Sequence, residues 1–106
     1  MKRQESIAEL KRQLINSHWP MCNELAKTIA EYGGEEAKWA LKEALEAKRH
    51  HIRTAAIESL ATFDDPAIVE WLKPLLDDAA YETRITAKSA LEKLTGEKTV
   101  TARGEE

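Results

Sequence analysis

Leucines recur along the chain at a fixed interval, in a pattern typical of repeated amphipathic helices. Leu10, Leu41 and Leu72 are spaced 31 residues apart, each is followed by a lysine, and each has a second leucine four positions later. A second set of apolar positions follows at the same interval: Leu25, Ala56 and Ala87; Ile29, Leu60 and Leu91; Tyr32, Phe63 and Leu94. Because spacings of four and three place side chains on one helix face, each unit predicts two amphipathic helices.

The repeat predicts six helices arranged as three pairs. Their expected bounds are 3–15, 20–32, 35–48, 50–63, 66–77 and 81–95. Gly33 and Gly96 follow two of these segments, where glycine commonly ends a helix, and Pro66 can begin the fifth helix after the capping oxygen of Asp65. Pro74 lies inside the fifth segment, where it predicts a kink without moving the end of the helix.

The three pairs are expected to form one domain. A single helix pair cannot bury its own apolar face, so the pairs should stack, each covering its neighbour. The predicted fold is therefore all-α: a short α-α superhelix over residues 1–96, with units at about 3–33, 34–64 and 65–96. Residues 97–106 lack the periodicity and are expected to form a flexible tail.

The second helix of the middle unit resembles a known repeat. Residues 52–66, IRTAAIESLATFDDP, resemble the second helix of a HEAT-type repeat, whose pattern is approximately V-R-x-x-A-x-x-A-L-x-x-L-G-D-P. Residues 83–96, TRITAKSALEKLTG, repeat the match, and overall the chain is similar to the HEAT-like family over residues 3–96. The resemblance implies three stacked helical hairpins and a non-catalytic scaffold that binds a protein partner in a groove along its second helices.

The same family commonly places aspartates in the turn within each pair, where they form a ladder with the arginines of successive repeats. Asp78 lies at such a position in the third unit. In the middle unit Ala47 and Arg49 take the places of both aspartates. Arg53 is therefore expected to lack its usual partner within its own repeat.

The outward positions of the second helices are expected to line the groove and bind the partner. These residues are Lys27, Arg53, Thr54, Ile57, Glu58, Ile85, Lys88 and Glu92. Ile57 and Ile85 are apolar at positions that the buried stripe leaves exposed, so we expect them to hold an apolar side chain of the partner. Charged substitutions of both should then abolish binding without loss of helicity. The sequence leaves open the partner's identity and whether the chain is a monomer or a weak dimer.

Three aromatic rings share another column of the repeat. Trp19, His50 and Tyr81 are each 31 residues apart, and stacking would place them along one edge of the molecule, about 10 Å from each other. Aromatic side chains with a polar atom are favoured at interfaces, which makes this edge a second candidate binding surface. The alternative is that each ring packs its own turn onto the helix below. Trp39 and Trp71 share no column and are expected to be core or partly buried packing residues.

Basic residues concentrate in the stretch KRHHIR, residues 48–53, which has several possible roles. The helix dipole favours cations where Lys48 and Arg49 follow a predicted helix end, so a structural role is preferred. Nucleic-acid binding along this edge is a less favoured alternative, because the net charge of −3 gives no overall attraction to phosphate. A metal site needs three or four converging ligands, and the adjacent side chains of His50 and His51 are expected to diverge, so neither metal nor cofactor is expected.

Composition agrees with a single soluble domain. Of the 106 residues, 42% are hydrophobic and 33% charged, and no apolar run approaches the roughly 18 residues of a membrane span. The charged amino-terminal segment is unlike a signal peptide, so a cytoplasmic location and no membrane contact are expected. No nucleophile with a base and no glycine-rich phosphate loop is found, so enzyme activity is not expected. The alternative is an accessory subunit of an enzyme, since short HEAT-like repeats also resemble those of bilin lyases.

Overall fold

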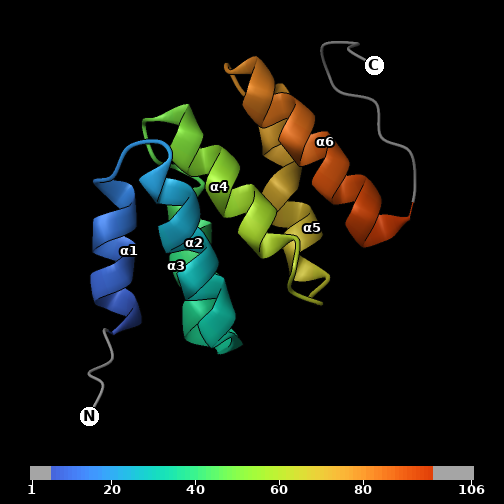
Figure 1. Ribbon diagram of the computed structural model, residues 1–106. Coiled ribbons are helices and arrows are strands. Elements are labelled where there is room, and N and C mark those ends of the chain that lie inside the picture. Colours follow the sequence, from blue (N-terminus) through green and yellow to red (C-terminus); the bar gives the residue numbers. More distant parts are fainter. Residues whose placement is uncertain (1–5, 97–106) are drawn as a thin grey trace.

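The computed structural model describes residues 6–96, and the regular secondary structure of this part of the chain is entirely helical (Figure 1). Its elements are α1 (Ile7–Ile15), α2 (Met21–Tyr32), α3 (Gly34–Ala44), α4 (His50–Leu60), α5 (Ala67–Leu72), the 3₁₀ helix η1 (Lys73–Asp77) and α6 (Tyr81–Thr95). No strand occurs among these residues, so the predicted all-α class and helix order are confirmed. The tail predicted at 97–106 lies outside the described residues.

The third and fourth helices end earlier than the predicted bounds of 48 and 63. At the end of α3 the backbone N–H groups of Leu45, Glu46 and Ala47 donate to carbonyls only three residues back. Bonds of this span tighten the last turn of a helix and carry the chain out of the α conformation. The N–H groups of Thr62 and Phe63 do the same after α4. Apolar periodicity continues through such a turn, which is why it overestimates helix length.

Pro74 changes the fifth helix more than expected. The α-helical segment α5 stops at Leu72, and the chain continues as η1 across the proline. Proline has no N–H to donate and its ring crowds the preceding turn, so the regular α-helical hydrogen bonding is interrupted there. The disturbance lies where it was predicted and the helical segment still ends at Asp77, as predicted, but its second half is a 3₁₀ helix and not a kinked α-helix.

The helix pairs stack in chain order, with α4 at the centre. The second helices pack side by side, since α4 contacts both α2 and α6, and α4 also packs against its own partner α3 (Figure 1). The first pair is joined to the second through α1 and α3 as well as through α2 and α4. A central helix covered on several sides has few side chains left at the surface. This arrangement decides which of the predicted groove residues are exposed.

The apolar columns of the repeat form the core. All three leucines of the first column are buried, and so are Ile29, Leu60 and Leu91 of the second helices. Other fully buried side chains come from every pair, among them Leu14, Ile52 and Ile68. The buried apolar residues belong to one continuous cluster. Across residues 6–96, none of the helices combines the length and apolarity needed to cross a bilayer.

Candidate functional site

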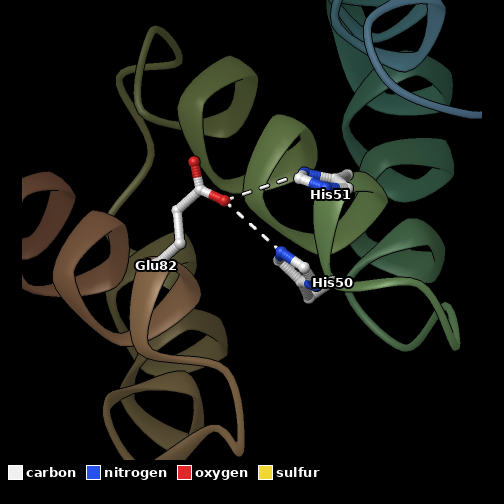
Figure 2. A group of neighbouring side chains, drawn as sticks. All are labelled: His50, His51 and Glu82. Atoms are coloured by element: carbon white, nitrogen blue, oxygen red, sulfur yellow. Dashed lines mark ion pairs between the residues drawn. The ribbon is translucent and has the colours of Figure 1, made fainter.

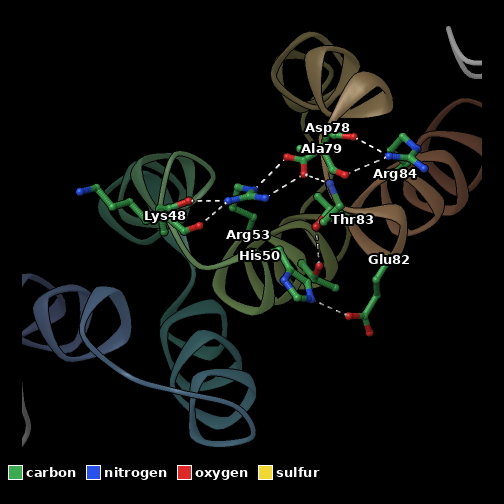
Figure 3. Close-up of polar contacts among 11 residues, drawn as sticks. Lys48, His50, Arg53, Asp78, Ala79, Glu82, Thr83 and Arg84 are labelled. Carbon is green, nitrogen blue, oxygen red and sulfur yellow. Dashed lines mark hydrogen bonds and ion pairs between the residues drawn. The ribbon is translucent and has the colours of Figure 1, made fainter.

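Arg53 joins the turn of its own pair to the turn of the next pair (Figure 3). Its Nε and Nη2 atoms donate to the two carboxylate oxygens of Asp78 at 2.9 and 2.8 Å. Its Nη1 atom donates to the carbonyl oxygens of Ala47 and Lys48 at 2.8 and 2.9 Å. The side chains of Arg53 and Asp78 are only 15% and 8% exposed. As expected, Arg53 does not pair with an aspartate of its own turn; its carboxylate comes from the following repeat, which the sequence reasoning did not foresee.

Two further arginines donate to turn carbonyls, one within its own pair and one across to the preceding pair. Arg84 donates to the carbonyl oxygens of Asp78 and Ala79, at 2.8 and 3.3 Å. Arg49 donates to the carbonyl oxygen of Ser17 in the first turn, at 3.1 Å. We call these contacts of Arg49, Arg53 and Arg84 the arginine ladder. Because its arginines are held by internal acceptors, the ladder favours the structural interpretation of KRHHIR for both arginines of that stretch.

Asp78 is the acidic member of the ladder. Burial opposes ionisation of its carboxyl group, but hydrogen bonds from Arg53 and from the Ala80 backbone N–H, at 2.9 Å, outweigh that effect and lower its pKa. Such a carboxylate stabilises the folded chain at every pH at which it is ionised.

Two predicted groove residues are buried instead of exposed. Ile57 has no exposed surface, and Thr54 is buried with its Oγ1 atom 3.0 Å from Oγ1 of Thr83 (Figure 3). Both positions face outward from an isolated pair, but the neighbouring second helices cover α4 in the stack. A charge at Ile57 would enter the core, so that substitution cannot serve as a test of partner binding.

The surface between α2 and α4 contains a groove of about 550 Å³. It is lined by Asn23, Glu24, Lys27, Ala30, Glu31, Ala55, Glu58, Ser59 and Thr62. The lining combines small side chains with three carboxylates and a single lysine. We call it the acidic groove.

A second hollow of about 470 Å³ lies between α4 and α6. It is lined by Glu58, Ala61, Ile85, Thr86, Ser89, Ala90 and Lys93. Of the predicted groove residues, Lys27, Glu58 and the partly buried Ile85 therefore line hollows. Lys88 and Glu92 do not, and their charged atoms lie 4.0 Å apart on α6. Glu58 belongs to both hollows, which makes it the centre of the surface formed by the second helices.

Glu58 is ionised at a cost. The residue is exposed as a whole, but its surroundings partly desolvate the carboxyl group, and the nearby carboxylate of Glu82 adds repulsion, so the pKa of Glu58 is raised. Glu58 has the ordinary glutamate pKa in the unfolded chain, so at a pH above that value its carboxyl group loses its proton more readily in the unfolded chain than in the folded chain. Ionisation of Glu58 therefore favours unfolding, and the contribution it makes below that pKa is lost as the pH rises through the folded pKa.

Replacing Glu58 with glutamine should raise the melting temperature near neutral pH. The gain should disappear below the ordinary glutamate pKa of about 4.3, where neither state of the wild type carries the charge. Thermal unfolding followed by circular dichroism at the two pH values measures both effects. The exposed Glu46→Gln variant is the control. An equal gain in both variants, or a gain that persists in acid, would contradict this account of Glu58.

The aromatic column is exposed at its two ends. Trp19 and Tyr81 are 61% and 62% exposed, as an interface role requires, and that role stays a prediction. The ring facing Trp19 is that of His51, with centroids 6.1 Å apart, although the repeat had aligned Trp19 with His50. Tyr81 instead lies against the Arg84 guanidinium, 5.6 Å from the ring centroid. Both ends of the column therefore contact residues from outside it.

His50 and His51 converge, contrary to the sequence-based expectation. Their ring centroids are 4.0 Å apart, and Oε1 of Glu82 lies 3.4 Å from Nε2 of His50 and 3.7 Å from Nδ1 of His51 (Figure 2). The two rings, at the start of α4, both turn toward the Glu82 carboxylate on α6. Their side chains therefore do not diverge as those of adjacent helix positions usually do. Sequence reasoning missed Glu82, although it stands 31 residues after His51 in the same column of the repeat.

Trp39 and Trp71 form a pair on the first helices. Their ring centroids are 5.0 Å apart, and Nζ of Lys42 lies 5.7 and 5.4 Å from the two rings. Trp71 is partly buried, as expected. Trp39 is 53% exposed, so its assignment as a core or partly buried residue was wrong. The stripe of small residues on α3, Ala37, Ala40 and Ala44, fills the interior and leaves Trp39 on the outer face.

Comparison with known families agrees with this architecture. Residues 52–78 match the family described as PBS lyase HEAT-like repeat. The matched segment runs from the first turn of α4 to Asp78 and so includes the central pair of the arginine ladder. None of the curated proteins matches the chain.

Proposed function

Because the chain carries a HEAT-like repeat, we propose that it is a non-catalytic binding module that holds a basic, amphipathic segment of a partner protein in the acidic groove. The observation that carries the proposal is the composition of the α2–α4 surface. Glu24, Glu31 and Glu58 face a single lysine, Lys27, around small side chains. Helical repeat modules commonly present such surfaces along their second helices.

The small side chains of the groove define what can enter it. Ala30, Ala55 and Ser59 leave room for the side chains of a helix or extended segment that would lie along α2 and α4. Amphipathic helices are often recognised by laying their apolar face into such a groove. The occupant should therefore present small or medium apolar side chains toward the groove.

The glutamates of the groove determine which side chains the bound segment should carry beside its apolar face. Lysine or arginine side chains beside the apolar face would pair with the glutamates, and electrostatic complementarity would speed association and fix orientation. The raised pKa of Glu58 supports this assignment: burial and, to a lesser extent, the Glu82 carboxylate disfavour its ionised form, which a neighbouring cation would stabilise. Phosphate backbones would meet repulsion in the same place.

Peptide selection on the full-length chain tests the proposal. Displayed random peptides should enrich for segments with basic residues on one face and apolar residues on the other. Binding of a selected, fluorescently labelled peptide should weaken by at least about tenfold in the Glu24→Lys, Glu58→Lys double variant, since two attractive pairs become repulsive. Fluorescence anisotropy at low and moderate salt measures the affinity.

A charge reversal outside the groove is the matched control. Glu46 is exposed beyond the end of α3 and does not line the acidic groove, so Glu46→Lys should bind the peptide as the wild type does. Enrichment of peptides without basic residues would contradict the proposal. So would equal binding by the double variant and the wild type, with both folded by circular dichroism.

A further inference from the structure

We propose that His50, His51 and Glu82 form a binding site for a divalent transition-metal ion of the zinc type. The site lies where α4 and α6 begin, outside the acidic groove (Figure 2). Two imidazole nitrogens and one carboxylate oxygen are present, each from a different residue, and these ligand atoms all lie within 4.8 Å of one another. The site is independent of the partner-binding proposal.

The distances between the ligand atoms suit a tetrahedral ion. Zinc bonds to nitrogen and oxygen are about 2.0–2.1 Å long, so neighbouring ligand atoms in a tetrahedron are about 3.3 Å apart. The carboxylate oxygen of Glu82 lies 3.4 Å from Nε2 of His50 and 3.7 Å from Nδ1 of His51. Small rotations of exposed side chains would bring these atoms to the required spacing.

The type of ligand selects the class of ion. Imidazole suits zinc, copper, nickel and iron, whereas magnesium and calcium prefer sites built from oxygen alone. The side chains of His50, His51 and Glu82 are 39%, 41% and 58% exposed. An ion can therefore reach the site from solvent, and water or a donor from another molecule can complete its coordination.

The charges around the cluster favour a cation. The carboxylate of Glu58 interacts electrostatically with that of Glu82, and Asp78 interacts with His50. Of the nearby arginines, Arg53 is paired with Asp78 and Arg49 donates to the Ser17 carbonyl. The Lys48 side chain extends away from His50 (Figure 3).

Metal binding would connect two repeats. His50 and His51 begin α4, whereas Glu82 lies in the first turn of α6, so a bound ion would link the second pair to the third. An ion that binds the folded chain and not the unfolded chain raises the apparent stability by mass action. A zinc-dependent rise in melting temperature is therefore expected.

Titration of the metal-free full-length chain with zinc chloride tests the site. Calorimetry should show one ion per chain, and cobalt chloride should give the visible absorption of a tetrahedral complex. Loss of an outer-shell partner already weakens metal sites about 10–100-fold, so loss of a ligand in His51→Ala or Glu82→Gln should weaken zinc binding at least as much. Neither variant should gain thermal stability from zinc.

His18→Ala is the matched control, since His18 is exposed and is not one of the converging ligands. It should bind zinc as the wild type does. The proposal is overturned if the wild type binds no zinc, since the histidines then serve only as ion-pair partners of Glu82. It is also overturned if the ligand variants bind as well as the wild type, or if His18→Ala loses as much affinity as they do. Circular dichroism of the metal-free variants separates these results from misfolding.

Discussion

Replacing Asp78 with alanine should lower the free energy of unfolding by about 3 kcal/mol, the lower end of the range for removing one partner of a buried ion pair. The substitution leaves the Arg53 guanidinium without its carboxylate and the Ala80 N–H without its acceptor. We expect the lower end because both side chains keep some exposure, 15% for Arg53 and 8% for Asp78. Urea unfolding monitored by circular dichroism measures the loss.

The loss of stability should depend on where the removed aspartate lies, and not only on the removal of a carboxylate. Asp64 is exposed in the loop before α5, so Asp64→Ala should change stability by less than about 0.5 kcal/mol. Arg53→Met should be destabilising like Asp78→Ala, because it leaves the carboxylate buried and unpaired. A loss at Asp78 no larger than the loss at Asp64 would show that the arginine ladder does not stabilise the stack.

The ladder also gives the stability a dependence on pH. The pKa of Asp78 is lowered in the folded chain, so its contribution is fully present above the ordinary aspartate pKa. That contribution is lost as the pH falls through the lower, folded pKa. The wild type should therefore lose more stability on acidification than Asp78→Asn, which has no carboxylate to protonate. Urea unfolding at several acidic pH values compares the two slopes.

Replacing Ile57 with alanine should also lower the free energy of unfolding by about 3 kcal/mol. Ile57 is fully buried on α4, the helix that contacts α2, α3 and α6. Truncating a buried isoleucine loses its transfer free energy and leaves a cavity that a helix held on several sides cannot close. The same urea unfolding experiment measures the effect.

Ile85→Ala is the matched control for Ile57→Ala. Ile85 is only partly buried and lines the hollow between α4 and α6, so the same truncation there should cost about 1 kcal/mol or less. Equally small losses at the two isoleucines would mean that Ile57 is exposed in solution and would restore the original assignment of both to a binding surface.

The periodicity of the sequence was sufficient for the class and order of helices. Side chains such as Leu41 and Leu60 are buried because positions three and four apart share a face, and this rule depends on one helix at a time. The result at Pro74 was less complete, because a proline's position can be read from the sequence but the switch of a whole turn to 3₁₀ geometry depends on the packing around it.

The candidate site was predicted less well because it depends on contacts between helices. Thr54 and Ile57 face outward from their own pair, and only the stack decides that they are covered. In the same way, Arg53 receives its carboxylate from the following repeat. Glu82 could have been predicted, because it stands 31 residues after His51 and so takes the same position in the next second helix.

The arginine ladder has a consequence for how this chain tolerates change. Five of its acceptors are main-chain oxygens, at Ser17, Ala47, Lys48, Asp78 and Ala79, and every residue type supplies that atom. A residue in such a turn can be substituted without loss of the hydrogen bond, because the arginine binds its backbone carbonyl and not its side chain. Substitutions at turn positions of this kind should therefore cost little stability. His50 and His51 follow one such turn, at the start of α4.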